Sequence, residues 1–289
     1  MPANLQKKAA AIRQIIRQRL LTVIYQPVVE PAQAKVAGFE ALVRFLPGAE
    51  LAFTSDPLTI KELISTAEQA GLYQQLDLLV TELVLADIRQ LHSLPNDIFF
   101  SVNLCPASLN YPDFVRKLML LCAQEAILPS RLCFEITERA MLNHYARTEA
   151  LPQLHALGFQ FAIDDFISGY ANFSVLMNPL LSTVKLDHRI TDTLPDPAAT
   201  GQFMHVLINL LHTLNKKIIV EGVENTEQLA LLYANNYSCF QGYLFSKPLH
   251  SYQLSEFCGY FPQQCASLLA ELPQLPQTSP DLITKNTTN

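Results

Sequence analysis

Short apolar runs that alternate with longer, helix-like stretches set the pattern of this chain. Runs of this length between helices are typical of buried parallel strands. We predict strands at residues 22–29, 36–45, 98–103, 131–137, 159–165, 182–187, 218–221 and 239–245. Helical spacing of apolar residues predicts helices at 57–70, 73–93, 111–126, 139–157, 198–214, 225–235 and 251–270. The 289 residues fit one (β/α)8 barrel of about 250 residues with short ends.

The first two predicted strands depart from a regular barrel. Only a short turn at Pro31 joins them, and a parallel crossover needs a dozen or more residues, so they must be antiparallel neighbours. We therefore expect a barrel domain over residues 21–270. Residues 1–20 form a basic amphipathic helix, which we interpret as a cap on the barrel floor rather than a membrane-surface helix. Residues 271–289 are rich in Pro and polar residues and predict a disordered tail.

Polar side chains recur at the carboxyl ends of the predicted strands, often on one parity of the strand. These candidates are Glu40, Asn103, Glu135, Asp164, Asp165 and Glu221. In a closed barrel the carboxyl ends of the strands share one face, so we expect these groups to meet there. Carboxylates that close destabilise the fold unless cations intervene, and an all-oxygen donor set suits Mg²⁺ or Mn²⁺. The tandem Asp164-Asp165 favours two ions.

Lys185 is the lysine on these inward parities, and two roles are open for it. It balances the charge of the acids as a structural ion pair, or it orients or deprotonates an attacking water. Residue chemistry alone does not separate the two roles.

Composition narrows the class of protein. Hydrophobic residues make up 49% of the chain and charged residues 16%, which supplies a sizeable core. The net charge of −6 disfavours non-specific nucleic-acid binding. No apolar stretch reaches the ~18 residues of a membrane span, and no signal-peptide pattern opens the chain, so we expect a cytoplasmic protein. The six cysteines form no CxxC pair and are expected to be buried, reduced thiols.

Taken together, eight ordered sequence blocks resemble the EAL-domain family, bacterial phosphodiesterases of cyclic di-GMP. The blocks are Tyr25-Gln26-Pro27, Glu40-Ala41-Leu42-Val43-Arg44, Val102-Asn103-Leu104, Phe134-Glu135-Ile136-Thr137-Glu138, Asp164-Asp165-Phe166, Lys185-Leu186-Asp187, Glu221-Gly222-Val223-Glu224 and Gln241-Gly242-Tyr243-Leu244-Phe245. They follow the family's order over residues 22–250. A lone Glu-Ala-Leu carries no information, whereas eight blocks in the family's order have a very small probability of matching by chance.

The resemblance implies a fold, a site and partners. The fold is a TIM-like (β/α)8 barrel with its first strand antiparallel. The implied site, residue by residue, is Glu40, Asn103, Glu135 and Asp164 for one ion, Asp164, Asp165 and Glu221 for a second, Lys185 and Gln241 beside the attacking water, Gln26, Leu42, Arg44 and Asp187 for the dinucleotide, Glu224 as a further active-site acid, and Glu138 bracing the loop after Asp165. The implied partners are cyclic di-GMP and a second copy of the chain.

The loop at residues 166–172 departs from the family pattern. Ile167, Ala171 and Asn172 stand where the family usually has Gly, Ser and Ser. A β-branched residue does not readily adopt the positive φ that Gly allows.

The favoured function is hydrolysis of cyclic di-GMP to pGpG. The alternative is a cyclic di-GMP sensor with weak or no turnover, and a more distant one is an enolase-like or aldolase-like barrel that uses Mg²⁺ or a Lys185 Schiff base.

Overall fold

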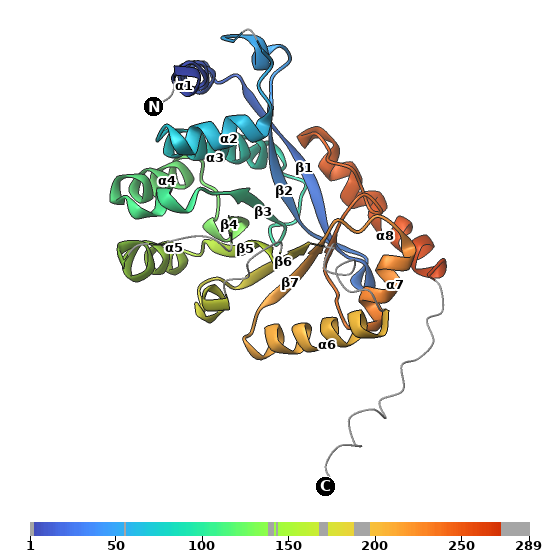
Figure 1. Ribbon diagram of the computed structural model, residues 1–289. Helices are drawn as coiled ribbons and strands as arrows, with labels where there is room; N and C mark the ends of the chain where they lie inside the picture. The colour runs from blue at the N-terminus through green and yellow to red at the C-terminus, as the bar shows by residue number, and fades with distance from the viewer. Residues whose placement is uncertain are drawn as a thin grey trace.

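The computed structural model describes residues 3–54, 56–137, 142, 144–167, 173–187 and 197–272. Within these residues the strands close into a barrel in chain order, with the helices outside it (Figure 1). The strands are β1 (Leu21–Glu30), β2 (Lys35–Phe45), β3 (Phe99–Asn103), β4 (Leu132–Thr137), β5 (Gln160–Phe166), β6 (Thr183–Asp187), β7 (Lys217–Glu221) and β8 (Phe240–Gln241). The predicted (β/α)8 barrel is confirmed.

Strand β1 runs against both of its neighbours, whereas all the other adjacent pairs are parallel. The connection between β1 and β2 is only the short helix Pro31–Gln33 and the next residue. The register pairs Leu21 with Phe45 and Gln26 with Glu40. The antiparallel first strand, expected from the short connection, is therefore confirmed.

Most helices lie close to their predicted positions. The helices are α1 (Ala3–Arg17), α2 (Ile60–Gln69), α3 (Tyr73–Gln90), α4 (Pro112–Gln124), α5 (Leu151–Ala156), α6 (Pro197–Thr213), α7 (Thr226–Ala234) and α8 (Leu254–Ala270). The helix predicted at 139–157 is described as helical only from residue 144, with the π-helical turn Ala146–Ala150 before its α-helical part, and residues 139–141 lie outside the described residues. Local capping sets several ends. Thr59 and Glu62 form a capping box at α2, and the Asn225 side chain accepts the Gln228 N–H at the start of α7. Gly158 follows α5 at φ +104°, a positive φ that glycine adopts readily at the end of a helix.

The position of α1 differs from our interpretation. Because β1 runs antiparallel, its first residue Leu21 pairs with Phe45 at the carboxyl end of β2, away from the barrel floor. Helix α1, which leads into this end, lies beside α2, with Lys8 Nζ 2.5 Å from Glu62 Oε1 (Figure 1). The prediction of a floor cap is wrong, and the reason is the reversed direction of the first strand.

The last strand is also shorter than predicted. Residues 239–245 were expected to be extended, but β8 ends at Gln241 and residues 243–245 form a turn. This turn packs closely on the segment after β7, since Leu244 N–H donates to the Val223 carbonyl at 3.0 Å. A Cβ at Gly242 would overlap the Val223 backbone, so only glycine fits there. The predicted tail beyond residue 272, Glu138, and Ala171 and Asn172 of the loop lie outside the described residues.

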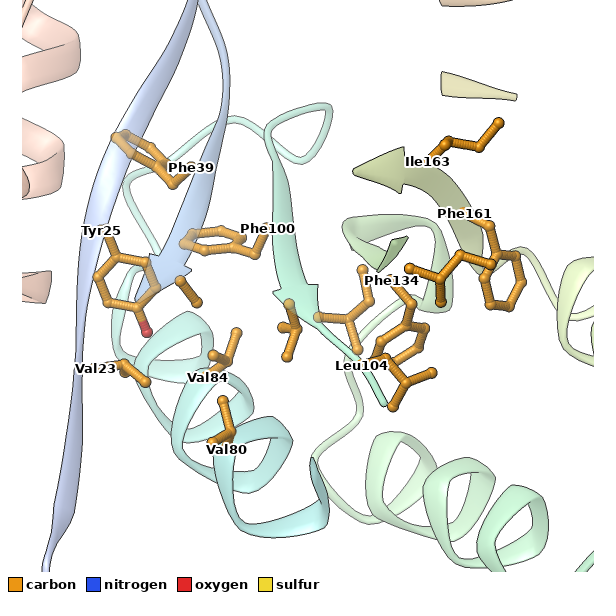
Figure 2. Packing of buried hydrophobic residues seen from close by; sticks show 14 of the residues in the cluster. Val23, Tyr25, Phe39, Val80, Val84, Phe100, Leu104, Phe134, Phe161 and Ile163 are labelled. Carbon is orange, nitrogen blue, oxygen red and sulfur yellow. The ribbon is translucent and has the colours of Figure 1, made fainter. Parts of the chain in front are cut away.

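The hydrophobic core lies between the barrel and the helices around it (Figure 2). Successive strand residues point to opposite faces, and the apolar parity points outward. Tyr25 and Phe100 make an edge-to-face contact at 5.7 Å, and Val80 and Val84 of α3 pack in the same cluster. The opposite parity, which carries the polar side chains, is left to face the barrel interior.

Candidate active site

Five strands bring charged side chains into the barrel at one level. Glu40 comes from β2, Glu135 from β4, Asp164 from β5, Lys185 from β6 and Glu221 from the end of β7. Their strand neighbours Phe39, Phe134 and Ile163 are buried in the core on the other face. The alternation of polar and apolar residues along each strand therefore produces this convergence.

Four carboxylates contact the ammonium group of Lys185. The distances from Lys185 Nζ are 3.2 Å to Glu40, 2.9 Å to Glu135, 3.3 Å to Asp164 and 2.7 Å to Glu221. The side chains of Lys185 and Glu135 are only 1% and 2% exposed. We call these five residues the lysine–carboxylate cluster. Four of the five predicted acids thus meet at the Lys185 ammonium group.

Two amide side chains hold Glu40 within the cluster. Gln241 Nε2 donates to Glu40 Oε2 at 2.6 Å, and Asn103 Nδ2 donates to Glu40 Oε1 at 3.2 Å. In both side chains the amide nitrogen therefore faces the Glu40 carboxylate. Among the described residues, the buried Gln241 Oε1 has no hydrogen-bond partner.

Glu40 and Glu135 both contact Lys185, yet their pKa values move in opposite directions. Burial raises the pKa of Glu135, and repulsion from Glu40, Asp164 and Glu221 adds to this, outweighing the attraction of Lys185. Burial acts in the same sense on Glu40, but Lys185 and the amide donors Gln241 and Asn103 together lower its pKa. The amide hydrogen bonds to the charged form of Glu40, and the repulsion of Glu135 by its neighbouring acids, together account for the difference.

The remaining charges follow the same balance. Burial raises the pKa of Glu221 to about 8, aided by Glu40 and Asp164 and opposed by Lys185. Burial alone favours neutral Lys185, but the four surrounding carboxylates raise its pKa well above the ordinary value. Lys185 is therefore a protonated cation in this arrangement, which disagrees with a Schiff-base nucleophile. Lys185 forms the ion pairs that one of its two predicted roles requires.

Asp164, Asp165 and Glu221 form a group with the geometry of a cation site. One carboxylate oxygen from each lies within 4.8 Å of the others. Asp165 adopts φ +53°, and the register between β5 and β6 shifts between Ile163 and Phe166. This irregularity turns consecutive acids toward the strand end. An all-oxygen set of carboxylates fits Mg²⁺ or Mn²⁺ rather than zinc.

The other predicted site residues lie around the cluster. Gln26 pairs with Glu40 across β1 and β2, and half-buried Leu42 and Arg44 follow Glu40 at two-residue intervals toward the end of β2. Arg44 Nη1 donates to the Val43 carbonyl at 2.8 Å. Asp187 pairs in register with Glu221 at the ends of β6 and β7. Glu224 is exposed in the segment that follows β7.

Ile167, the described residue of the altered loop, adopts φ +70°. This is the left-handed conformation that a β-branched residue occupies at a cost. Ile167 stands where the resemblance places Gly, and its backbone geometry agrees with the expected cost of the substitution. The strain lies two residues from Asp165.

Asp77 of α3 was missed by the sequence analysis. Its side chain is buried behind the strand that carries Asn103 and accepts a hydrogen bond from Ser108 Oγ at 2.5 Å. The available signal was an acid among the apolar positions Leu76, Leu79 and Val80 of an amphipathic helix, where a solvated residue is not expected.

The fold and the site define a class of protein: a (β/α)8 barrel with an antiparallel first strand and acidic side chains inside it. The chain belongs to the EAL domain family, whose sequence pattern it matches over residues 9–248. It is 31% identical over 265 residues to the cyclic di-GMP phosphodiesterase NbdA of Pseudomonas aeruginosa. The aligned region covers 91% of this chain and 33% of NbdA. It thus spans about a third of the length of the first curated relatives that it matches.

Solved structures agree with this assignment. The PaMucR phosphodiesterase in complex with c-di-GMP superposes with a TM-score of 0.73 at 28% identity, over 86% of this chain and 99% of that one. Klebsiella pneumoniae BlrP1 in a calcium and cy-diGMP complex superposes with a TM-score of 0.64 at 26% identity, over 80% of this chain and 56% of that one. Along the described part of our chain, none of the helices combines the length and apolar character needed to cross a bilayer.

Proposed function

We propose that this chain is a metal-dependent phosphodiesterase that hydrolyses cyclic di-GMP to linear pGpG. The observation that carries the proposal is the convergence of four carboxylates from four strands at one level of the barrel. Buried acids at this density favour divalent cations, and phosphodiester hydrolysis is a reaction for which such cations are suited. Membership of the EAL family and similarity to cyclic di-GMP phosphodiesterases support the substrate.

We assign two ions to the site, each Mg²⁺ or Mn²⁺. One is held by Glu40, Asn103, Glu135 and Asp164, and the other by Asp164, Asp165 and Glu221. When bound, such ions lower the pKa of coordinated water and offset negative charge on the phosphoryl group. BlrP1 has been solved with cy-diGMP together with calcium and with manganese, which supports a divalent ion beside this class of ligand.

The side chains of this chain supply the remaining functions. Lys185, whose ammonium group contacts the four carboxylates, orients the attacking water and steadies charge at phosphorus. Gln241 fixes Glu40 by its hydrogen bond, and Glu224 adds a further acid at the rim. In the reaction the attacking water gives a proton to a neighbouring carboxylate as its oxygen bonds to phosphorus, one P–O ester bond of the ring breaks, and the leaving oxygen takes a proton from surrounding water.

The dinucleotide is assigned to the side of the barrel formed by β1, β2 and β6. The guanidinium of Arg44 matches a phosphate, and the carboxylate of Asp187 matches the N–H edge of guanine. Gln26 and Leu42 complete this surface, on the same face of the β1–β2 pair as Glu40. Glu138, outside the described residues, keeps its assignment as a brace for the loop that follows Asp165.

We further propose a homodimer in the cytoplasm. Phe203, Val206 and Leu210 occur at helical spacing on α6, and their exposed fractions of 39%, 65% and 39% describe an apolar stripe that a second copy can cover. The six cysteines are free, which suits a reducing compartment. Light scattering of the wild type and of Val206→Asp tests the dimer, because a monomeric wild type contradicts it and a monomeric variant supports it.

A product assay tests the activity. Purified protein with cyclic di-GMP and Mn²⁺ is expected to release pGpG, and Glu40→Ala is expected to remove this activity. Glu82→Ala, which changes a surface acid of α3, serves as the matched control and should match the wild type. Tight cyclic di-GMP binding without pGpG identifies a sensor, and absence of both binding and product refutes the proposed function.

A further inference from the structure

Helix α3 places a buried carboxylate against the outside of the barrel. Asp77 is only 7% exposed and lies beside the buried Leu76 and Val80. Burial raises the pKa of Asp77 to about 8, while hydrogen bonds from Ser108 and the Cys105 backbone act to lower it. Burying a carboxylate in such surroundings costs free energy unless it accepts hydrogen bonds.

Both donors to Asp77 belong to one short segment. Ser108 Oγ donates at 2.5 Å, and the backbone N–H of Cys105 donates as well. The segment continues as the short helix Pro106–Asn110, in which the Ser108 N–H donates to the Cys105 carbonyl at 2.9 Å. Asp77 therefore holds this helix at its N-cap residue and at its third residue, like a cap supplied from another element.

The segment held by Asp77 begins directly after a candidate metal ligand. Asn103 ends β3, two residues before Cys105, and its Nδ2 donates to Glu40 at 3.2 Å. The next residue, Leu104, donates its N–H to the Glu135 carbonyl at 2.9 Å. The chain beyond β3 is thus fixed on one side by β4, and on the other by Asp77.

We propose that Asp77 is a positioning residue that sets the amide of Asn103 for metal binding, by anchoring Cys105 and Ser108 from outside the barrel. The inference rests on the proposed function, in which Asn103 ligates an ion. Cys105 N–H and the Ser108 hydroxyl are two donors that both need an acceptor, and a carboxylate supplies two oxygens. An asparagine supplies one oxygen and turns its NH₂ group toward the second donor.

Asp77→Asn and Ser108→Ala test the inference through metal affinity rather than turnover alone. At pH 8.5, where the Asp77 carboxyl with its pKa of about 8 is mostly ionised, calorimetric titration of Mn²⁺ into each purified protein is expected to show affinity weakened about tenfold in Asp77→Asn, and by a smaller factor in Ser108→Ala. Thr81→Val is the matched control, since its buried hydroxyl donates within α3 to the Asp77 carbonyl oxygen. That variant should bind Mn²⁺ like the wild type.

Each outcome decides the question. If Asp77→Asn lowers the urea midpoint while the Mn²⁺ affinity equals that of the wild type, Asp77 is merely structural and the inference is overturned. If Asp77→Asn does not fold, Ser108→Ala decides, and unchanged Mn²⁺ affinity there overturns the inference. If the wild type binds Mn²⁺ and forms pGpG, the proposed function stands whatever the variants show. If the wild type does neither, the proposed function fails and the inference falls with it.

Discussion

Replacing Glu221 by glutamine is expected to stabilise the metal-free protein while weakening its metal site. Glu221 shares the single Lys185 ammonium with three other carboxylates, and burial with this crowding raises its pKa from 4.5 to about 8. Below pH 4.5 the carboxyl is protonated in both the folded and the unfolded state, so the substitution changes little. Between pH 4.5 and 8 the unfolded chain releases this proton first, and the stability of the wild type falls as pH rises.

The size of the effect follows from the same pKa. A carboxyl pKa that moves from 4.5 to about 8 corresponds to roughly 5 kcal/mol of lost stability above pH 8. Relaxation and water entry reduce the cost of buried charge, so for Glu221→Gln we expect a gain of about 2 kcal/mol in unfolding free energy at pH 8.5. Little gain is expected at pH 4.5, where the folded carboxyl is protonated and only about half of the unfolded chains have lost the proton.

Urea unfolding in EDTA at pH 4.5 and pH 8.5, followed by circular dichroism, measures this difference. The surface variant Glu82→Gln controls for a simple change in net charge and should show no gain that grows with pH. Adding Mn²⁺ at pH 8.5 should raise the midpoint of the wild type more than that of Glu221→Gln. The reasoning is refuted if Glu221→Gln is less stable than the wild type at pH 8.5, or if its gain is the same at both pH values.

Three further predictions concern neighbouring residues. Lys185→Met leaves four buried carboxylates without their cation and should lower the unfolding free energy in EDTA by about 3–5 kcal/mol. Mn²⁺ should restore part of this loss. A variant as stable as the wild type in the urea assay contradicts the prediction. Ile167→Gly removes the strain of φ +70° and should gain about 1 kcal/mol with a higher turnover rate, whereas an unchanged rate in the pGpG assay shows that the substitution does not limit catalysis. Asp164→Asn and Asp165→Asn should each reduce the drop in melting temperature that EDTA causes, and equal drops in wild type and variants count against metal at this pair.

The sequence predicted the barrel and the convergence of the acids because both follow from simple geometry. A period of two along a strand separates Glu40 from Phe39 and Ala41, and parallel strands share one carboxyl end. The antiparallel first strand followed from a connection too short for a crossover. These features depend on local spacing, which the sequence contains directly.

Features that depend on contacts between distant segments were not predictable in the same way. The position of α1 beside α2 follows from the direction of β1, and the early end of β8 follows from the packing of Gly242 on Val223. The opposite pKa directions of Glu40 and Glu135 depend on which acid receives the two amide donors. Asp77 looks like one misplaced acid until its contacts with Cys105 and Ser108 are known.

The central claim is that acids from separate strands meet around divalent ions inside one barrel. Crystals grown with Mn²⁺ and cyclic di-GMP, measured for manganese anomalous scattering, test it most directly. We predict two anomalous peaks about 3.5–4 Å apart, with Asp164 between them and Glu40 and Glu221 on opposite sides. Anomalous density that is absent from the lysine–carboxylate cluster, or that lies only on the protein surface, would contradict the account.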